Sequence, residues 1–213
     1  YGRWDSLVYM AQVWKALRRM RDYDVVQIIN PMFLEMKSER IRPIYEYLRK
    51  HNKRMFIGAY GMDYYWVNTC RTTQTFRYSD FNFGDRLRTD DIAMTEVRDW
   101  IGTDKGRLNQ EIAADCDGIA AGLYEYYACY HPAFPDKTEF IPFPINTDTT
   151  VRTAPPVTDK VRFFIGVQKS RGVYKGTDVM LRALERVADR HPDRCEIVKA
   201  ESVPFPVYQH MMD

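Results

Sequence analysis

The chain is poor in the residues that most often build metal and disulfide sites. It has four cysteines and four histidines in 213 residues. No two cysteines stand at CxxC spacing, so reduced thiols in a cytoplasmic protein are expected. The histidines are scattered, and no metal site is expected from them. No apolar run approaches the roughly 20 residues of a membrane-spanning helix, and no signal peptide is recognisable.

The charge of the chain has no dominant sign. The sequence has 31 Lys+Arg against 29 Asp+Glu, which leaves a net charge of +2. A nucleic-acid-binding module would carry a larger positive charge, so nucleic acid is not an expected partner. The hydrophobic content of 45% is enough to bury the core of one large domain or of two small ones.

Apolar patterns in the first two thirds of the chain predict strands that alternate with helices. This alternation implies right-handed βαβ crossovers and a parallel sheet, which is an α/β fold. The run at 24–29 is β-branched and predicts a buried strand, and Ser38 is predicted to cap the helix that follows it. Strands are predicted at 24–29, 54–59, 118–120 and 138–142, and helices at 5–21, 41–48, 93–115 and 122–130.

The strand order decides which polar residues could form a site. Ligands of such sheets bind beyond the carboxyl ends of the strands. That edge would carry Asn30, the turn at 60–63 and residues 120–122. The sequences Asp22-Tyr23-Asp24 and Asp115-Cys116-Asp117 have the DxD form of some metal sites. Both precede their strands, so they fall on the opposite edge and are not expected to hold a metal.

The stretch 163–178 has the pattern of a strand, an anion-binding loop and a helix. An apolar run ends at a glycine, a basic loop follows, and Thr177 is predicted to cap the helix. The first N–H groups of a helix have no intrahelical partner, and the helix dipole favours an anion there. The alternative is a solvated basic turn. The candidate phosphate-binding residues are Gly166, Lys169, Arg171, Lys175, Gly176 and Thr177.

A change in composition predicts two domains. Four prolines among threonines and aspartates fall within residues 142–156 and predict a linker. The alternation then restarts with strands at 161–165 and 195–199 and a helix at 178–190. The predicted division is an N-terminal domain at 1–145, a linker at 146–160, and the beginning of a C-terminal domain at 161–213.

The segment 70–91 is long for a loop in a compact domain, which favours a binding role. It interleaves four arginines with aromatic residues, a combination that suits a phosphate or a ring. The favoured alternative is a folded cover over the sheet, with buried aromatics and with arginines paired to aspartates. The arginines are Arg71, Arg77, Arg86 and Arg88.

Three places in the chain resemble the GT-B fold glycosyltransferases, in particular the retaining, nucleotide-sugar-dependent family 4. The best match is Phe164–Leu184, with a glycine-ended strand, a basic loop, then Lys-Gly and a helix. The segment 140–146 is similar to the crossing between the two domains of that family. The turn Tyr60-Gly61-Met62-Asp63 is similar to the acceptor-side turn. The resemblance implies two Rossmann-like domains whose parallel sheets are flanked by helices, the second being truncated.

The resemblance also implies an activity. Such enzymes move a hexose from a nucleoside-diphosphate sugar to a glycan or glycolipid acceptor with retention, commonly in bacterial polysaccharide biosynthesis. They would be cytoplasmic and could associate peripherally with the inner face of a membrane. Lys175, with Lys169 or Arg171, would hold and neutralise the leaving diphosphate, so that no metal or other cofactor is required. Gly166 would allow close approach, and Asp63 would orient an acceptor hydroxyl.

The sequence departs from the family pattern in ways that leave other functions open. Tyr60 stands where the family often has histidine. The family's donor-binding glutamates would lie beyond Asp213, and its glycine-rich loop would precede Tyr1. The chain is therefore expected to be a fragment with little activity by itself. The alternatives are a GT-B sugar-nucleotide epimerase, which needs acid/base carboxylates, and a non-catalytic GT-B scaffold subunit.

Overall fold

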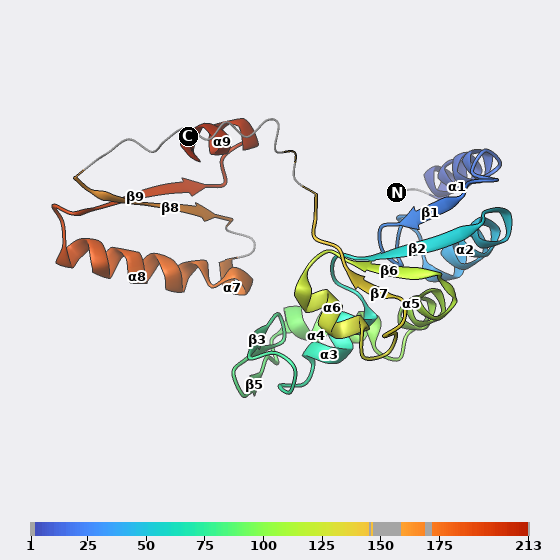
Figure 1. Ribbon diagram of the computed structural model, residues 1–213, viewed down its shortest axis with the longest axis horizontal. Helices are drawn as coiled ribbons and strands as arrows, with labels where there is room; N and C mark the ends of the chain where they lie inside the picture. Colours follow the sequence, from blue (N-terminus) through green and yellow to red (C-terminus); the bar gives the residue numbers. More distant parts are fainter. Residues whose placement is uncertain (1–2, 145, 147–158, 169–171, 213) are drawn as a thin grey trace. The chain divides into compact units, whose positions relative to one another are not determined.

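A computed structural model describes residues 3–144, 146, 159–168 and 172–212. The chain divides into two compact units, Tyr1–Pro144 and Ile145–Asp213, whose elements are labelled in Figure 1. Most of the predicted linker lies outside the described residues. Each unit is described by itself.

The first unit is built on a four-stranded parallel sheet with the strand order β1-β2-β6-β7. The predicted α/β architecture is confirmed here as a Rossmann-like parallel sheet flanked by helices, and in Figure 1 helices α3, α4, α5 and α6 lie on one side of it. Its elements are α1 (Arg3–Leu17), β1 (Val25–Ile28), α2 (Ser38–His51), β2 (Arg54–Ala59), α3 (Tyr64–Cys70), β3 (Tyr78–Ser79), β4 (Asn82–Phe83), β5 (Arg86–Leu87), α4 (Asp91–Trp100), α5 (Asp104–Asp115), β6 (Gly118–Ala121), α6 (Tyr124–Tyr130) and β7 (Thr138–Phe140).

The core of this unit lies between the sheet and the connecting helices. Ile28, Ile57 and Ile119 are register partners on β1, β2 and β6, and all three are buried. On α2, Ile44 and Leu48 are one turn apart and belong to the same buried cluster. Burying each such side chain stabilises the fold by roughly 1.5–3 kcal/mol. The apolar spacing predicted from the sequence therefore places these side chains where they hold the helix against the sheet.

Several element boundaries differ from the sequence prediction for local reasons. The helix predicted at 93–115 is two helices, because Gly102 adopts a left-handed φ of +74° and Thr103 then caps α5 by accepting the Gly106 N–H. Ser38 does not cap α2. Lys37 occupies that position without a side-chain cap, and Ser38 is buried as the first helical residue.

The strand predicted to be buried at 24–29 is an edge strand. β1 pairs only with β2 among the described residues. Val25 of β1 is 54% exposed, and Ile29, which follows β1, is 66% exposed. Its β-branched composition predicted the strand correctly. Burial was predicted wrongly, because it depends on whether a further strand lies alongside.

The segment 70–91 forms a small antiparallel sheet of β3, β4 and β5. Phe81 and Asn82 are buried, and Arg88 pairs with Asp90 at 2.7 Å. Tyr78 and Phe83, in contrast, are at least half exposed. The prediction of a folded cover with buried aromatics and paired arginines is therefore confirmed at Phe81 and Arg88, and is wrong for Tyr78 and Phe83.

The second unit contains a two-stranded parallel sheet. Its elements are β8 (Val161–Val167), α7 (Gly172–Lys175), α8 (Thr177–Arg190), β9 (Cys195–Glu201) and α9 (Phe205–Met212). β8 and β9 pair over seven residues, from Val161 with Cys195 to Val167 with Glu201. Their parallel direction brings the carboxyl ends of both strands to one edge, where the sequence places the candidate phosphate-binding residues.

Candidate functional site

A pocket of about 480 Å³ lies where β8 and β9 end. Gly166 and Ala200 are register partners at this edge, and both line it. The residues beyond each strand complete the wall, so the pocket occupies the position that parallel α/β sheets use for ligands. Its lining consists of Gly166, Val167, Gln168, Lys175, Ala200, Ser202, Val203 and Tyr208.

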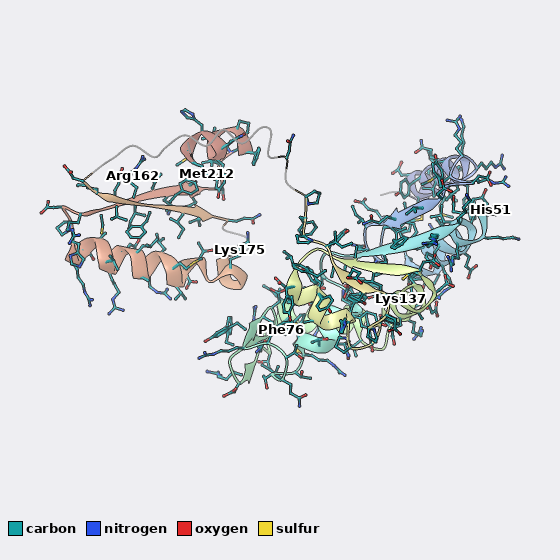
Figure 2. All side chains as sticks on the ribbon, viewed as in Figure 1. His51, Phe76, Lys137, Arg162, Lys175 and Met212 are labelled. Atoms are coloured by element: carbon teal, nitrogen blue, oxygen red, sulfur yellow. The ribbon has the colours of Figure 1, made fainter. Side chains whose placement is uncertain are left out.

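Lys175 brings a cation to this pocket. It is the last residue of α7 and is exposed. Figure 2 labels it on the side of the unit at which β8 and β9 end. An exposed ammonium group at a pocket wall can bind an anionic ligand without first breaking a buried contact.

The predicted N-cap at Thr177 is wrong, because the preceding glycine takes that position. Gly176 is the N-cap of α8, with φ +60° and ψ 25°, a left-handed conformation that glycine adopts without steric cost. This turn separates α7 from α8. Thr177 is instead the first helical residue and is buried.

The beginning of α8 presents backbone donors. The Val179 and Met180 N–H groups both donate to the Gly176 carbonyl oxygen at 3.1 Å. In an α-helix the N–H groups before these, on Thr177 and Asp178, have no intrahelical acceptor. These N–H groups and the partial positive charge at the start of this 14-residue helix favour an anion nearby. Lys175 is the last residue of α7 and lies two residues before α8 begins.

Gly166 allows a close approach of Tyr208, a neighbour that the sequence did not reveal. A Cβ atom at this position would lie 2.9 Å from the ring of Tyr208 on α9. Tyr208 also packs edge-on against Phe164, with ring centroids 5.3 Å apart. The space left by the missing side chain is therefore taken by Tyr208, which is itself part of the pocket lining.

Ser202 is a second pocket residue that sequence reasoning missed. It follows β9 directly and has a φ of +50°, a left-handed conformation that is uncommon for residues other than glycine. Strained backbone of this kind gathers at functional sites. Its position just beyond a predicted strand was the available signal. Lys169 and Arg171 lie outside the described residues, and the choice between them stays open.

Asp63, predicted to orient an acceptor hydroxyl, is buried inside the first unit with 1% of its surface exposed. It caps α3 by accepting the Trp66 N–H at 2.9 Å. The Tyr130 hydroxyl donates to its other oxygen at 2.6 Å and accepts from the Asn109 amide at 3.1 Å. Its oxygens face internal donors, so in this conformation the carboxylate supports the fold and does not meet a substrate.

Burial also raises the pKa of Asp63 to about 6, from an ordinary value of 3.8, against the lowering effect of its hydrogen bonds from Trp66 and Tyr130. The folded state therefore binds this proton more tightly than the unfolded chain does. The contribution of Asp63 to the unfolding free energy is smallest above about pH 6. It increases by up to roughly 3 kcal/mol as the pH falls from about 6 to about 4.

This pH dependence can be measured by urea unfolding of the wild type and of Asp63→Asn, which does not titrate. We expect the stability difference between the two proteins to shift in favour of the wild type as the pH falls through that window. A difference that stays constant from pH 7 to pH 4 would contradict a raised pKa in the folded state.

Tyr60 and Gly61 lie at the carboxyl end of β2, on the edge predicted for them. The Tyr60 hydroxyl accepts from Gln27 Nε2 at 2.7 Å, and its ring lies 5.1 Å from that of Phe143. No atom lies within 4 Å of where a Gly61 Cβ would be. Among the three acceptor-side residues, Tyr60 and Gly61 thus have accessible surroundings and Asp63 does not.

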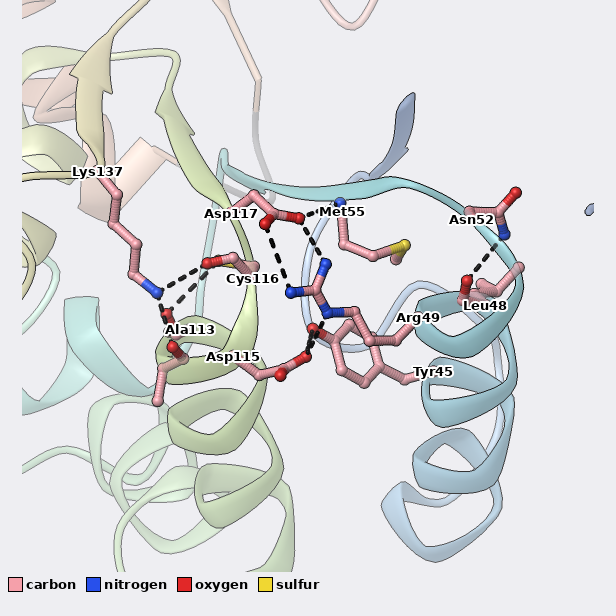
Figure 3. Close-up of polar contacts among 11 residues, drawn as sticks. Tyr45, Leu48, Arg49, Asn52, Met55, Ala113, Asp115, Cys116, Asp117 and Lys137 are labelled. Atoms are coloured by element: carbon pink, nitrogen blue, oxygen red, sulfur yellow. Dashed lines mark hydrogen bonds and ion pairs between the residues drawn. The ribbon is translucent and has the colours of Figure 1, made fainter. Parts of the chain in front are cut away.

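The second DxD sequence has a structural role (Figure 3). Asp115 accepts from the Tyr45 hydroxyl at 2.7 Å, and Asp117 accepts from the Met55 N–H at 2.7 Å. Arg49 of α2 contacts both carboxylates, at 3.2 Å and 2.5 Å. These contacts join α2 and α5 to the amino-terminal edge of the sheet. Within the described ranges, no group of three His, Cys, Asp or Glu side chains could hold a metal ion.

Comparison of the chain with protein-family models, curated proteins and solved structures gives no match. The fold itself defines the class, an α/β protein whose four-stranded parallel sheet is Rossmann-like. No helix within the described parts of the chain is long and apolar enough to span a membrane.

Proposed function

We propose that the protein is a GT-B type hexosyltransferase whose second unit binds the diphosphate of a nucleotide sugar. The observation that carries the proposal is the pocket beyond β8 and β9, which Lys175 lines two residues before α8 begins. The acceptor would be a glycan or a glycolipid. The likeness of the sequence motifs to family 4 supports transfer with retention.

The chemistry follows from where charge develops. Breaking the bond between a sugar and a diphosphate leaves negative charge on the diphosphate, and fixed donors aimed at it lower the barrier. The Lys175 ammonium group would neutralise that charge, and the N–H groups of Thr177 and Asp178 would donate to the phosphate oxygens. Ser202, which follows β9, offers a hydroxyl to the same pocket.

Lys175→Ala is expected to weaken binding of uridine or guanosine diphosphate by roughly ten- to a hundredfold. The reason is the loss of a hydrogen bond between charged groups, worth roughly 1.5–3 kcal/mol. Isothermal titration calorimetry of the full-length protein with both diphosphates and their sugars measures the change.

The matched control is Arg186→Ala, which removes one positive charge from the exposed surface of α8, further along the helix than Thr177 and outside the pocket. It is expected to leave the affinity unchanged. Equal loss in both variants would mean that net charge and not the pocket binds the nucleotide. Absence of binding to the wild type would remove both the transferase and the epimerase.

Product analysis separates the functions that share this site. Transfer to an acceptor releases the nucleoside diphosphate, whereas an epimerase returns a nucleotide sugar with the diphosphate bond intact. A scaffold subunit binds the nucleotide and produces neither.

A further inference from the structure

A second pocket, of about 650 Å³, lies in the first unit and is independent of the proposed nucleotide site. It is lined by residues of α1, of the segment that follows β1, and of the beginnings of α2 and α5. Its volume is in the range of roughly 300–1,000 Å³ that small-molecule sites usually have. Nothing in the proposed transfer reaction requires it.

Part of the lining of this pocket is apolar. Met10 comes from α1, and Met32, Leu34 and Met36 come from the segment after β1. The last three are half-buried and pack against the core, so they form a supported surface. Methionine is unbranched and polarizable, which lets such a surface adapt to a flexible hydrocarbon chain.

Another part of the lining is cationic. Lys37, Arg40 and Lys105 form it, and Glu35 is the one acidic side chain in the lining. Arg40 donates to the Ser6 hydroxyl at 2.8 Å. Lys105 lies 4.0 Å from the ring centre of Trp100 and 3.6 Å from an Asp99 oxygen. The ion pairs present among the described residues do not include Lys37 or Arg40, so the wall keeps an excess of positive charge.

We propose that this pocket binds an amphipathic anion, with an acidic head group among Lys37, Arg40 and Lys105 and an alkyl chain against the methionine side chains. The two kinds of lining residue match the two parts of such a ligand. A free anion would leave the apolar lining residues exposed to water, and an uncharged chain would leave Lys37 and Arg40 without a ligand counter-charge. Phosphate and carboxylate head groups both satisfy the cationic wall.

The proposal is tested by calorimetric binding of decyl phosphate to the 213-residue chain, below the concentration at which the amphiphile forms micelles. Decanoate, decanol and inorganic phosphate are the comparison ligands. We expect decyl phosphate to bind at least about tenfold more tightly than decanol or inorganic phosphate. If decanoate binds as tightly as decyl phosphate, the site accepts either acidic head group. If decanoate binds more weakly, the site is specific for a phosphate head group.

Two pairs of variants locate the binding. The double variant Lys37→Gln/Arg40→Gln is expected to weaken the binding of decyl phosphate roughly tenfold or more. The control Arg18→Gln/Arg19→Gln changes exposed positions outside the pocket and is expected to leave this binding unchanged. Leu34→Glu should abolish binding, and Leu87→Glu, at an exposed apolar residue of β5, should not. Equal affinity of the wild type and Lys37→Gln/Arg40→Gln, or no binding by a folded wild type, would overturn the proposal.

Discussion

Replacing Asp63 by alanine is expected to destabilise the first unit by about 2–4 kcal/mol. The change removes the cap of α3, which alone is worth about 1 kcal/mol. It also leaves the buried Tyr130 hydroxyl without its acceptor, and an unsatisfied buried group costs about 1–3 kcal/mol. Asn109, which donates to the same hydroxyl, would lose part of its support.

Urea unfolding followed by tryptophan fluorescence measures this effect, since Trp66 lies in the capped turn. Asp85→Ala is the control, because it removes an exposed carboxylate from the small antiparallel sheet. Its stability should equal that of the wild type within about 0.5 kcal/mol. If Asp63→Ala were equally neutral, the buried network would not be a source of stability, and a catalytic role for Asp63 would regain support.

Gly106→Ala is expected to destabilise the first unit by about 2–3 kcal/mol, although alanine is the better helix former. A Cβ atom at this position of α5 would lie 2.0 Å from the Trp100 carbonyl oxygen and 3.2 Å from the Tyr64 ring. The first neighbour is backbone and cannot move aside cheaply. The resulting strain exceeds the roughly 1 kcal/mol that alanine gains over glycine in a helix.

Thermal unfolding of the variant gives the measurement, with Gly61→Ala as the matched control. Gly61 is a glycine in the same unit, with no left-handed φ and with no atom within 4 Å of the place that an added methyl group would take. That substitution should be neutral or slightly stabilising. Equal stability of Gly106→Ala and the wild type would show that α4 and α5 can separate without cost.

The local patterns of the sequence were sufficient for the type of each main element. The β-branched run at 24–29 and the apolar spacing of Ile44 and Leu48 depend only on neighbours along the chain, and both predictions are confirmed by β1 and α2. The same alternation implied a parallel sheet. Because parallel strands place their carboxyl ends together, Gly166 and Lys175 could be assigned to one pocket edge before the fold was known.

Local patterns were insufficient for the caps. Thr177 and Ser38 are both good capping residues, yet each is buried as the first helical residue, and Gly176 and Lys37 take the cap positions. The choice between neighbouring residues depends on which side chain can be buried by the rest of the unit. That information is not contained in the capping preference itself.

The sequence by itself determined the α/β architecture and the edge at which a ligand can bind, because both follow from periodicity and chain direction. Only the tertiary structure decided which residues at that edge are accessible. Asp63 is enclosed by Tyr130 and Asn109, which come from distant segments, while Tyr208 fills the space beside Gly166. Burial is a property of everything that packs around a residue, so a short motif cannot specify it.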